Sequence, residues 1–118
     1  MADPIIEELE RNTAFRVDAY CEDYPDVIFE IILQHPPRQE EIQTAVTALQ
    51  NFMLQYNRRH FLRPIHYVSD VDSLPDGDHP RGIYIHVDFG GTCSPRALIG
   101  AVHALEETGL PIFRVALL

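Results

Sequence analysis

Two long segments of the chain place apolar residues at the three- and four-residue spacings of an amphipathic helix. They cover residues 38–60 and 95–108. In the second segment, Ser94 is a suitable N-cap, Pro95 suits the first helical position and Gly109 follows the last turn. The pattern therefore predicts two helices. The apolar stripe of the first is formed by Ile42, Ala45, Val46, Leu49, Phe52, Met53 and Tyr56.

Other segments have the composition or the alternation of β-strands. Residues 27–34 are rich in β-branched residues, residues 65–71 and 82–89 are strand-like, and residues 112–118 end the chain. Proline and an Asp-Gly pair in residues 72–81 predict a loop between the two middle strands. The resulting order, β-α-β-β-α-β, predicts an α+β ferredoxin-like fold with two helices on one face of an antiparallel sheet.

The N-terminal region adds elements to this core. Residues 13–22 alternate cleanly and predict a further strand, and residues 4–10 predict a short helix. The Asp-Tyr-Pro-Asp turn that follows suggests a hairpin with residues 27–34. In a ferredoxin-like sheet, however, the first core strand already has two neighbours. The extra strand must then join an edge, pair with another subunit or change the strand order.

We therefore expect a single domain over residues 1–118, with an N-terminal extension at 1–24 and the ferredoxin-like core at 25–118. The composition, 46% hydrophobic and 23% charged, is typical of a globular domain. No apolar run approaches the roughly 20 residues that span a bilayer. The N-terminus is acidic where a signal peptide would be basic, which predicts a cytoplasmic location.

Charge limits the classes of partner. The formal net charge is −9, with 18 acidic residues against nine basic ones, all of them arginine. Such a chain is repelled by phosphate, so we expect neither nucleic-acid nor membrane binding and favour a basic protein partner. Cys21 and Cys93 have no metal-ligand spacing, and we expect two free thiols.

The connection before the second helix is a candidate ligand site. Gly90, Gly91 and Thr92 precede the Ser94 cap, and Arg96 lies in the first turn, so an anion or carboxylate could bind there. The same residues also describe an ordinary strand-to-helix connection, which is the simpler interpretation. They match neither a P-loop nor a dinucleotide-binding fingerprint. A nucleophilic role for the neighbouring cysteine would need a histidine base that the sequence does not identify.

The sheet face opposite the helices is the second candidate. Because side chains alternate along a strand, six polar or aromatic residues are expected on this face. They are compatible with a metal site, an acid-base site, a protein interface or a solvated surface. The candidates are Glu30, His66, Tyr84, His86, Asp88 and Arg114. Four aspartates between Asp70 and Asp78 suggest weak cation binding or a solvated loop, because their spacing does not fit an EF-hand.

Three functions follow from these features. The first is a non-enzymatic interaction or regulatory domain, homodimeric, that binds a protein partner through its acidic surface or its open sheet face. The second is a sensor for a small metabolite or anion held near residues 90–96. The third is a small enzyme with acid-base or metal chemistry on the sheet. The sequence assigns no catalytic residue, metal ligand or cofactor, and it favours the first function.

Overall fold

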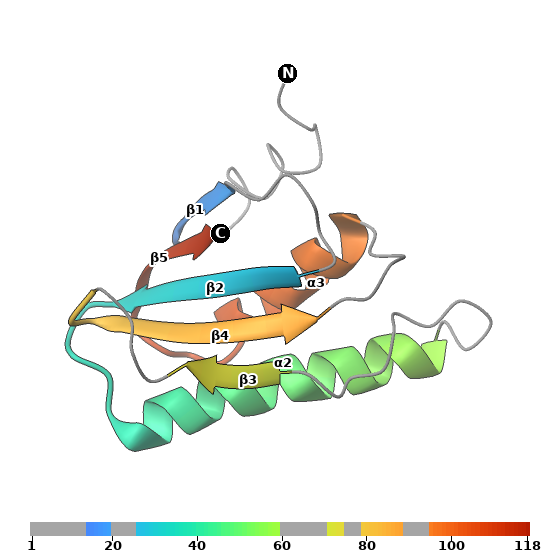
Figure 1. The fold of residues 1–118 in the computed structure, drawn as a ribbon, viewed down its shortest axis with the longest axis horizontal. Coiled ribbons are helices and arrows are strands. Elements are labelled where there is room, and N and C mark those ends of the chain that lie inside the picture. Colours follow the sequence, from blue (N-terminus) through green and yellow to red (C-terminus); the bar gives the residue numbers. More distant parts are fainter. Residues whose placement is uncertain (1–13, 20–25, 60–70, 75–78, 89–94) are drawn as a thin grey trace.

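The computed structural model describes residues 14–19, 26–59, 71–74, 79–88 and 95–118, and it places them in an α+β fold. The sheet has five strands in the order β1-β5-β2-β4-β3. In Figure 1 the helices α2 and α3 both pass behind the strands, so they cover one face of the sheet. The strands are β1 (Arg16–Ala19), β2 (Asp26–Leu33), β3 (Val71–Leu74), β4 (Gly82–Asp88) and β5 (Ile112–Leu117), and the helices are α2 (Gln39–Arg59) and α3 (Pro95–Glu106).

The core lies between the sheet and the two helices. Alternate residues of the three inner strands are buried against the helices, and the apolar stripes of α2 and α3 cover them. Burying each such side chain contributes about 1.5 to 3 kcal/mol, so this face holds the domain together. The largest fully buried side chains are Phe29, Ile31, Leu33, Leu49, Met53, Ile83, Ile85, Leu98, Leu105 and Leu117.

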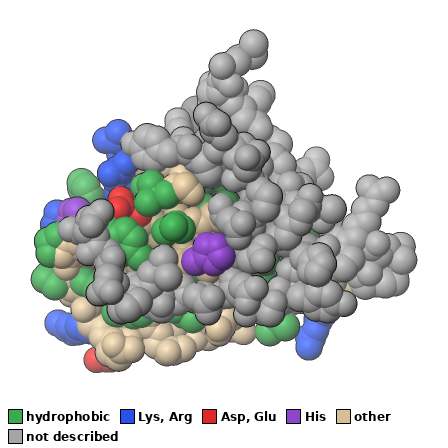
Figure 2. All heavy atoms as spheres, in the orientation of Figure 1, with side chains coloured by type: hydrophobic (Ala, Val, Ile, Leu, Met, Phe, Trp, Pro, Cys, Tyr) green, Lys and Arg blue, Asp and Glu red, His purple; other side chains and the backbone are tan. Residues whose placement is uncertain are grey.

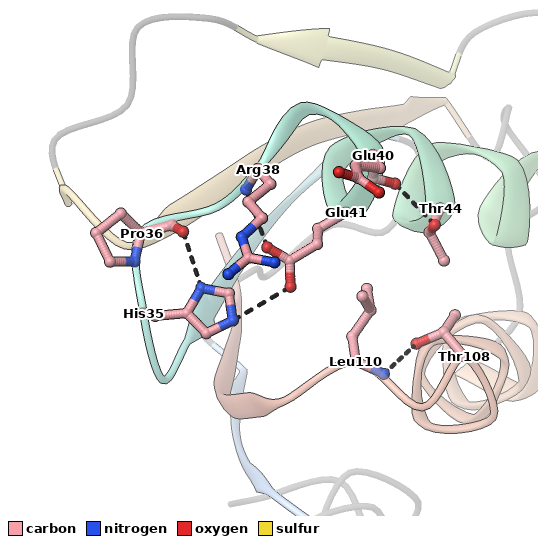
Figure 3. Close-up of polar contacts among 8 residues, drawn as sticks. All are labelled: His35, Pro36, Arg38, Glu40, Glu41, Thr44, Thr108 and Leu110. Atoms are coloured by element: carbon pink, nitrogen blue, oxygen red, sulfur yellow. Dashed lines mark hydrogen bonds and ion pairs between the residues drawn. The ribbon is translucent and has the colours of Figure 1, made fainter.

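The two predicted helices are confirmed, and the start of α2 and the end of α3, which lie at the same end of the helical layer (Figure 3), both carry caps. Before α2, the Arg38 N–H donates to Glu41 Oε1 at 2.9 Å, which is the reciprocal half of a capping box. The ring of His35 extends this cap, with Nε2 at 3.3 Å from Glu41 Oε2 and Nδ1 at 2.9 Å from the Pro36 carbonyl oxygen. After α3, Gly109 adopts a φ of 76°, the left-handed conformation that commonly ends a helix.

The predicted hairpin between the N-terminal strand and β2 is wrong. β1 instead pairs with β5 in parallel, with Arg16 opposite Arg114, and β5 lies between β1 and β2. The extra strand therefore joins an edge, and the sheet is mixed rather than antiparallel. Burial explains the choice, because Phe15 and Val17 reach the core from this edge. The Ala14 N–H also donates to Glu106 Oε2 at 2.8 Å, which ties the start of β1 to the end of α3.

The predicted boundary between the third strand and its loop is also wrong. We expected the strand at 65–71 and the loop from residue 72, but β3 runs from Val71 to Leu74 and pairs antiparallel with β4. Pairing with β4 overrides the turn preference of Asp72 and Ser73, because strand propensity depends on tertiary context. The predicted helix at 4–10 and the strand residues 65–70 lie outside the described residues. No helix in the described ranges is long and apolar enough to cross a membrane.

The two helices approach each other closely at Gly100. A Cβ built on this residue would lie 2.5 Å from Cε2 and 2.6 Å from Cζ of Phe52 on α2. Phe52 is partly buried against the core, and its ring lies 5.8 Å from that of Tyr56, centroid to centroid. The absence of a side chain at Gly100 therefore provides the space that the Phe52 ring occupies.

We expect Gly100→Ala to destabilise the protein by about 1 kcal/mol, because the clash outweighs the gain in helix propensity. In a Phe52→Ala background the same change should stabilise by about 0.5 to 1 kcal/mol, because the ring is gone and only the propensity remains. Urea unfolding of the four proteins measures both steps. A stabilising Gly100→Ala in the native background would contradict this packing.

Candidate functional site

The sheet face opposite the helices carries the described members of the second predicted site. Glu30 lies opposite Tyr84, and Ile28 lies opposite His86, so β2 and β4 are neighbours as expected. Arg114 lies further across the sheet, opposite Ile32 on one side and Arg16 on the other. In the orientation of Figure 1, Figure 2 shows hydrophobic side chains beside acidic, basic and histidine side chains on this face.

Tyr84 and Glu30 form a polar pair at one end of this face. The Tyr84 hydroxyl donates to Glu30 Oε2 at 2.7 Å and accepts the His79 N–H at 3.0 Å. The tyrosine is only 8% exposed, and its ring lies so close to Gly82 that a Cβ there would be 2.7 Å from Cε2. One Glu30 oxygen is thus committed to a contact that holds β2, β4 and the turn at His79 together.

His86 lies near the middle of the same face and is half-buried. Its partners in register are Ile28 on β2 and Asp72 on β3, while Glu30 is diagonal to it. Asp72 was predicted to lie in a loop, and only the register of β3 brings it opposite His86. Within the described part of the chain, no group of three or more His, Cys, Asp or Glu residues is placed to hold a metal ion.

A second polar cluster joins β1 to β5. Arg114 Nε donates to Asp18 Oδ2 at 2.6 Å, and Arg16 Nε lies 2.9 Å from the same oxygen. Partial burial raises the pKa of Asp18, but the hydrogen bond and charge of Arg114, together with Arg16, outweigh it and hold the pKa below its usual value. Asp18 also offsets the repulsion between the two arginines, which face each other across the parallel pair.

Much of the apolar surface on this face is already covered within the chain. Ile32 is 3% exposed and Ala116 is fully buried, although both lie on the side of the sheet away from the helices. The half-buried residues of the face, by contrast, include Ile28, Glu30, His86 and Arg114. The face is therefore mixed in character and its apolar part is largely closed.

A further feature is a groove on the outside of the helical layer, which was not predicted from the sequence. One part has a volume of about 520 Å³, and a second part of about 330 Å³ shares Ala48, Asn51 and Thr108 with it. Small residues on facing helix positions, Ala48, Gly100 and Ala104, were the signal in the sequence. Asn51, Phe52, Gln55, His103, Glu107 and Thr108 complete the first part, and Gln43, Thr44 and Thr47 complete the second.

Several predicted site residues lie outside the residues that the structure describes. They are Gly90, Gly91, Thr92, Ser94, the neighbouring Cys93, and His66. For Arg96 in α3 and Asp88 in β4, the structure describes the backbone but not the side chain. Anion binding near residues 90–96 stays a prediction, as does chemistry at His66. The predicted acidic loop is described only at Val71–Leu74, which belongs to β3.

Comparison with known proteins gives no assignment. No protein-family model matches this chain, and neither the curated proteins nor the solved structures contain a significant match. Any function must therefore be argued from the geometry.

We expect Tyr84→Phe to lower the free energy of unfolding by about 1 to 2 kcal/mol, because Glu30 and the His79 N–H lose a buried partner. In a Glu30→Leu background the same change should cost clearly less, because one of the two contacts is already absent. A double-mutant cycle from chemical unfolding measures the coupling. Equal costs in both backgrounds would show that the hydrogen bond contributes nothing.

We expect Asp18→Asn to destabilise the fold by about 1 to 2 kcal/mol at pH 7. The folded-state pKa of Asp18 is lowered. The ionised carboxylate therefore stabilises the fold above the unfolded value of about 3.9, and this contribution is lost as the pH falls through the folded-state pKa. The difference between variant and native protein should thus shrink in strong acid. Urea unfolding across pH measures it, with the exposed Glu107→Gln as control; a difference independent of pH would contradict the ion pair.

Proposed function

We propose that β2 to β5, with α2 and α3, form a ferredoxin-like core to which β1 is added. The order β5-β2-β4-β3 supports this, because the first core strand, β2, is central and antiparallel to both neighbours. Both helices lie on one face, as that arrangement requires. β1 then extends the sheet at the edge formed by β5.

We propose that the protein is a non-enzymatic interaction domain that binds a partner protein with a basic surface. The observation that carries this proposal is the groove between α2 and α3, whose lining combines small, uncharged polar and aromatic side chains with the imidazole of His103 and the carboxylate of Glu107. In a chain with a formal net charge of −9, such a groove favours a cationic segment over an anionic one. On the sheet face, by contrast, the apolar residues Ile32 and Ala116 are already buried.

We also propose that the domain acts as a homodimer. β1 lies at the edge of the sheet, where unpaired backbone groups can pair with a second chain. A dimer would present two helical grooves to one partner or to two. The two bound segments would then reinforce each other through effective concentration.

Binding is tested with a labelled peptide of alternating arginine and alanine and its glutamate counterpart, followed by fluorescence anisotropy. The arginine peptide should bind saturably at about 0.15 M salt and more weakly at higher salt, because exposed charges are screened there. The glutamate peptide should not bind. Absence of saturable binding of the arginine peptide even at low salt would refute the basic partner.

The oligomeric state is tested by light scattering on the untagged protein. The expected mass is twice the 13.5 kDa of the chain, and it should persist on dilution to low micromolar concentration. A mass of one chain at every concentration would refute the dimer and leave the binding proposal intact.

A further inference from the structure

The chemistry of the groove lining suits one kind of side chain in particular. Phe52 presents an aromatic ring, Asn51 and Gln55 carry amide oxygens, and Glu107 carries a carboxylate. A guanidinium group stacks on aromatic faces, donates up to five hydrogen bonds and pairs with carboxylates. Groups of all three kinds, from two helices, therefore line one groove.

The ring of Phe52 is held in place by its neighbours. The space left by Gly100 accommodates the Phe52 ring, and Tyr56 packs against it at an interplanar angle of 53°. Because the ring is already confined, little side-chain entropy remains to be lost when a ligand stacks on it.

The two glutamates at the end of α3 differ in what they contact. Glu106 accepts the Ala14 N–H through Oε2, and its Oε1 lies 3.8 Å from His103 Nδ1, so both oxygens have partners. Glu107 is exposed, and its carboxylate makes no hydrogen bond or ion pair with the residues that the structure describes. Glu107 is therefore the carboxylate of this groove that can pair with an incoming cation without breaking a contact of the fold.

From Ala48, the groove continues along α2 toward the start of that helix. Its second part is lined by uncharged polar residues and Ala48, and Figure 3 shows two of these residues, Thr44 on α2 and Thr108 after α3. From Gln43 to Gln55 the helix rises by about 18 Å. An extended segment of about six residues spans this length.

We propose that this groove receives an arginine-bearing extended segment of a partner protein, with one guanidinium against Phe52 and paired with Glu107. The proposal rests on the proposed function and specifies its site and its recognised side chain. The uncharged half of the groove contacts the backbone of the same segment through Thr44 and Asn51. The arginine lies in the first part of the groove, which Phe52 and Glu107 both line.

The test is titration of the full-length, isotope-labelled protein with an alanine peptide of about six residues that carries one arginine, followed by amide chemical shifts. The largest shifts should come from groove residues on both helices, with Asn51, Phe52, Gly100 and Ala104 among them. Largest shifts on β2 and β4, or confined to the first turn of α2, would overturn the groove as the site. Such a result would leave a basic partner possible, whereas no shift anywhere would count against the proposed function as well.

Two matched variants separate recognition from net charge. Glu107→Gln and Glu40→Gln each remove one negative charge, but Glu40, in the first turn of α2, is not among the residues that line the groove. We expect Glu107→Gln to weaken binding about two- to fivefold and Glu40→Gln to leave it nearly unchanged. Equal weakening by both would show that only the overall charge matters, and it would overturn the proposal.

A third variant, Phe52→Leu, removes the aromatic face but keeps an apolar side chain, and it should weaken binding about two- to fivefold. Circular dichroism confirms that each variant is folded before it is titrated. A peptide with lysine in place of arginine should bind more weakly, because its ammonium group is not planar and stacks less well. Equal binding of the two peptides, together with an unaffected Phe52→Leu variant, would overturn the stacking role.

Discussion

The fold depends on the double pairing of β5. This strand comes last in the chain, yet it lies between β1 and β2 and pairs with both. Its inward residues Val115 and Leu117 complete the core, and Ala116 on the other face is fully buried. On that second face, Arg114 meets Asp18, so an ion pair joins the two ends of the described chain. Without β5 in this position, β1 would have no neighbour and β2 would lose one of its two.

This arrangement also determines how the two faces of the sheet differ. The inner face is closed by α2 and α3. On the outer face, the Tyr84–Glu30 pair and the Asp18–Arg114 pair cross-link neighbouring strands. Partly buried polar groups lose contact with water, so pairing them within the chain stabilises the sheet and leaves them less free to bind a ligand. The outer face is therefore largely committed to structure.

The helical layer carries an open groove on its outer side. Small residues allow α2 and α3 to approach closely, while Phe52 fills the space over Gly100 and leaves a groove beside it. Helix packing through small residues brings polar side chains from both helices to the same line on the surface. Recognition of a partner can thus be built on rigid elements, whose positions are maintained by the core beneath them.

Local pattern alone determined both helices, because the three- and four-residue spacing over long segments is a strong signal, as in Leu49 and Met53. It also determined which residues of β2, β4 and β5 face the helices, because side chains alternate along a strand. Tertiary structure decided the rest. Nothing near residues 16–19 specifies that they pair with residues 114–117, because such pairing depends on contacts between the two ends of the chain. For the same reason the position of Asp72 opposite His86, and the groove between Phe52 and Glu107, appear only when the helices and strands are assembled.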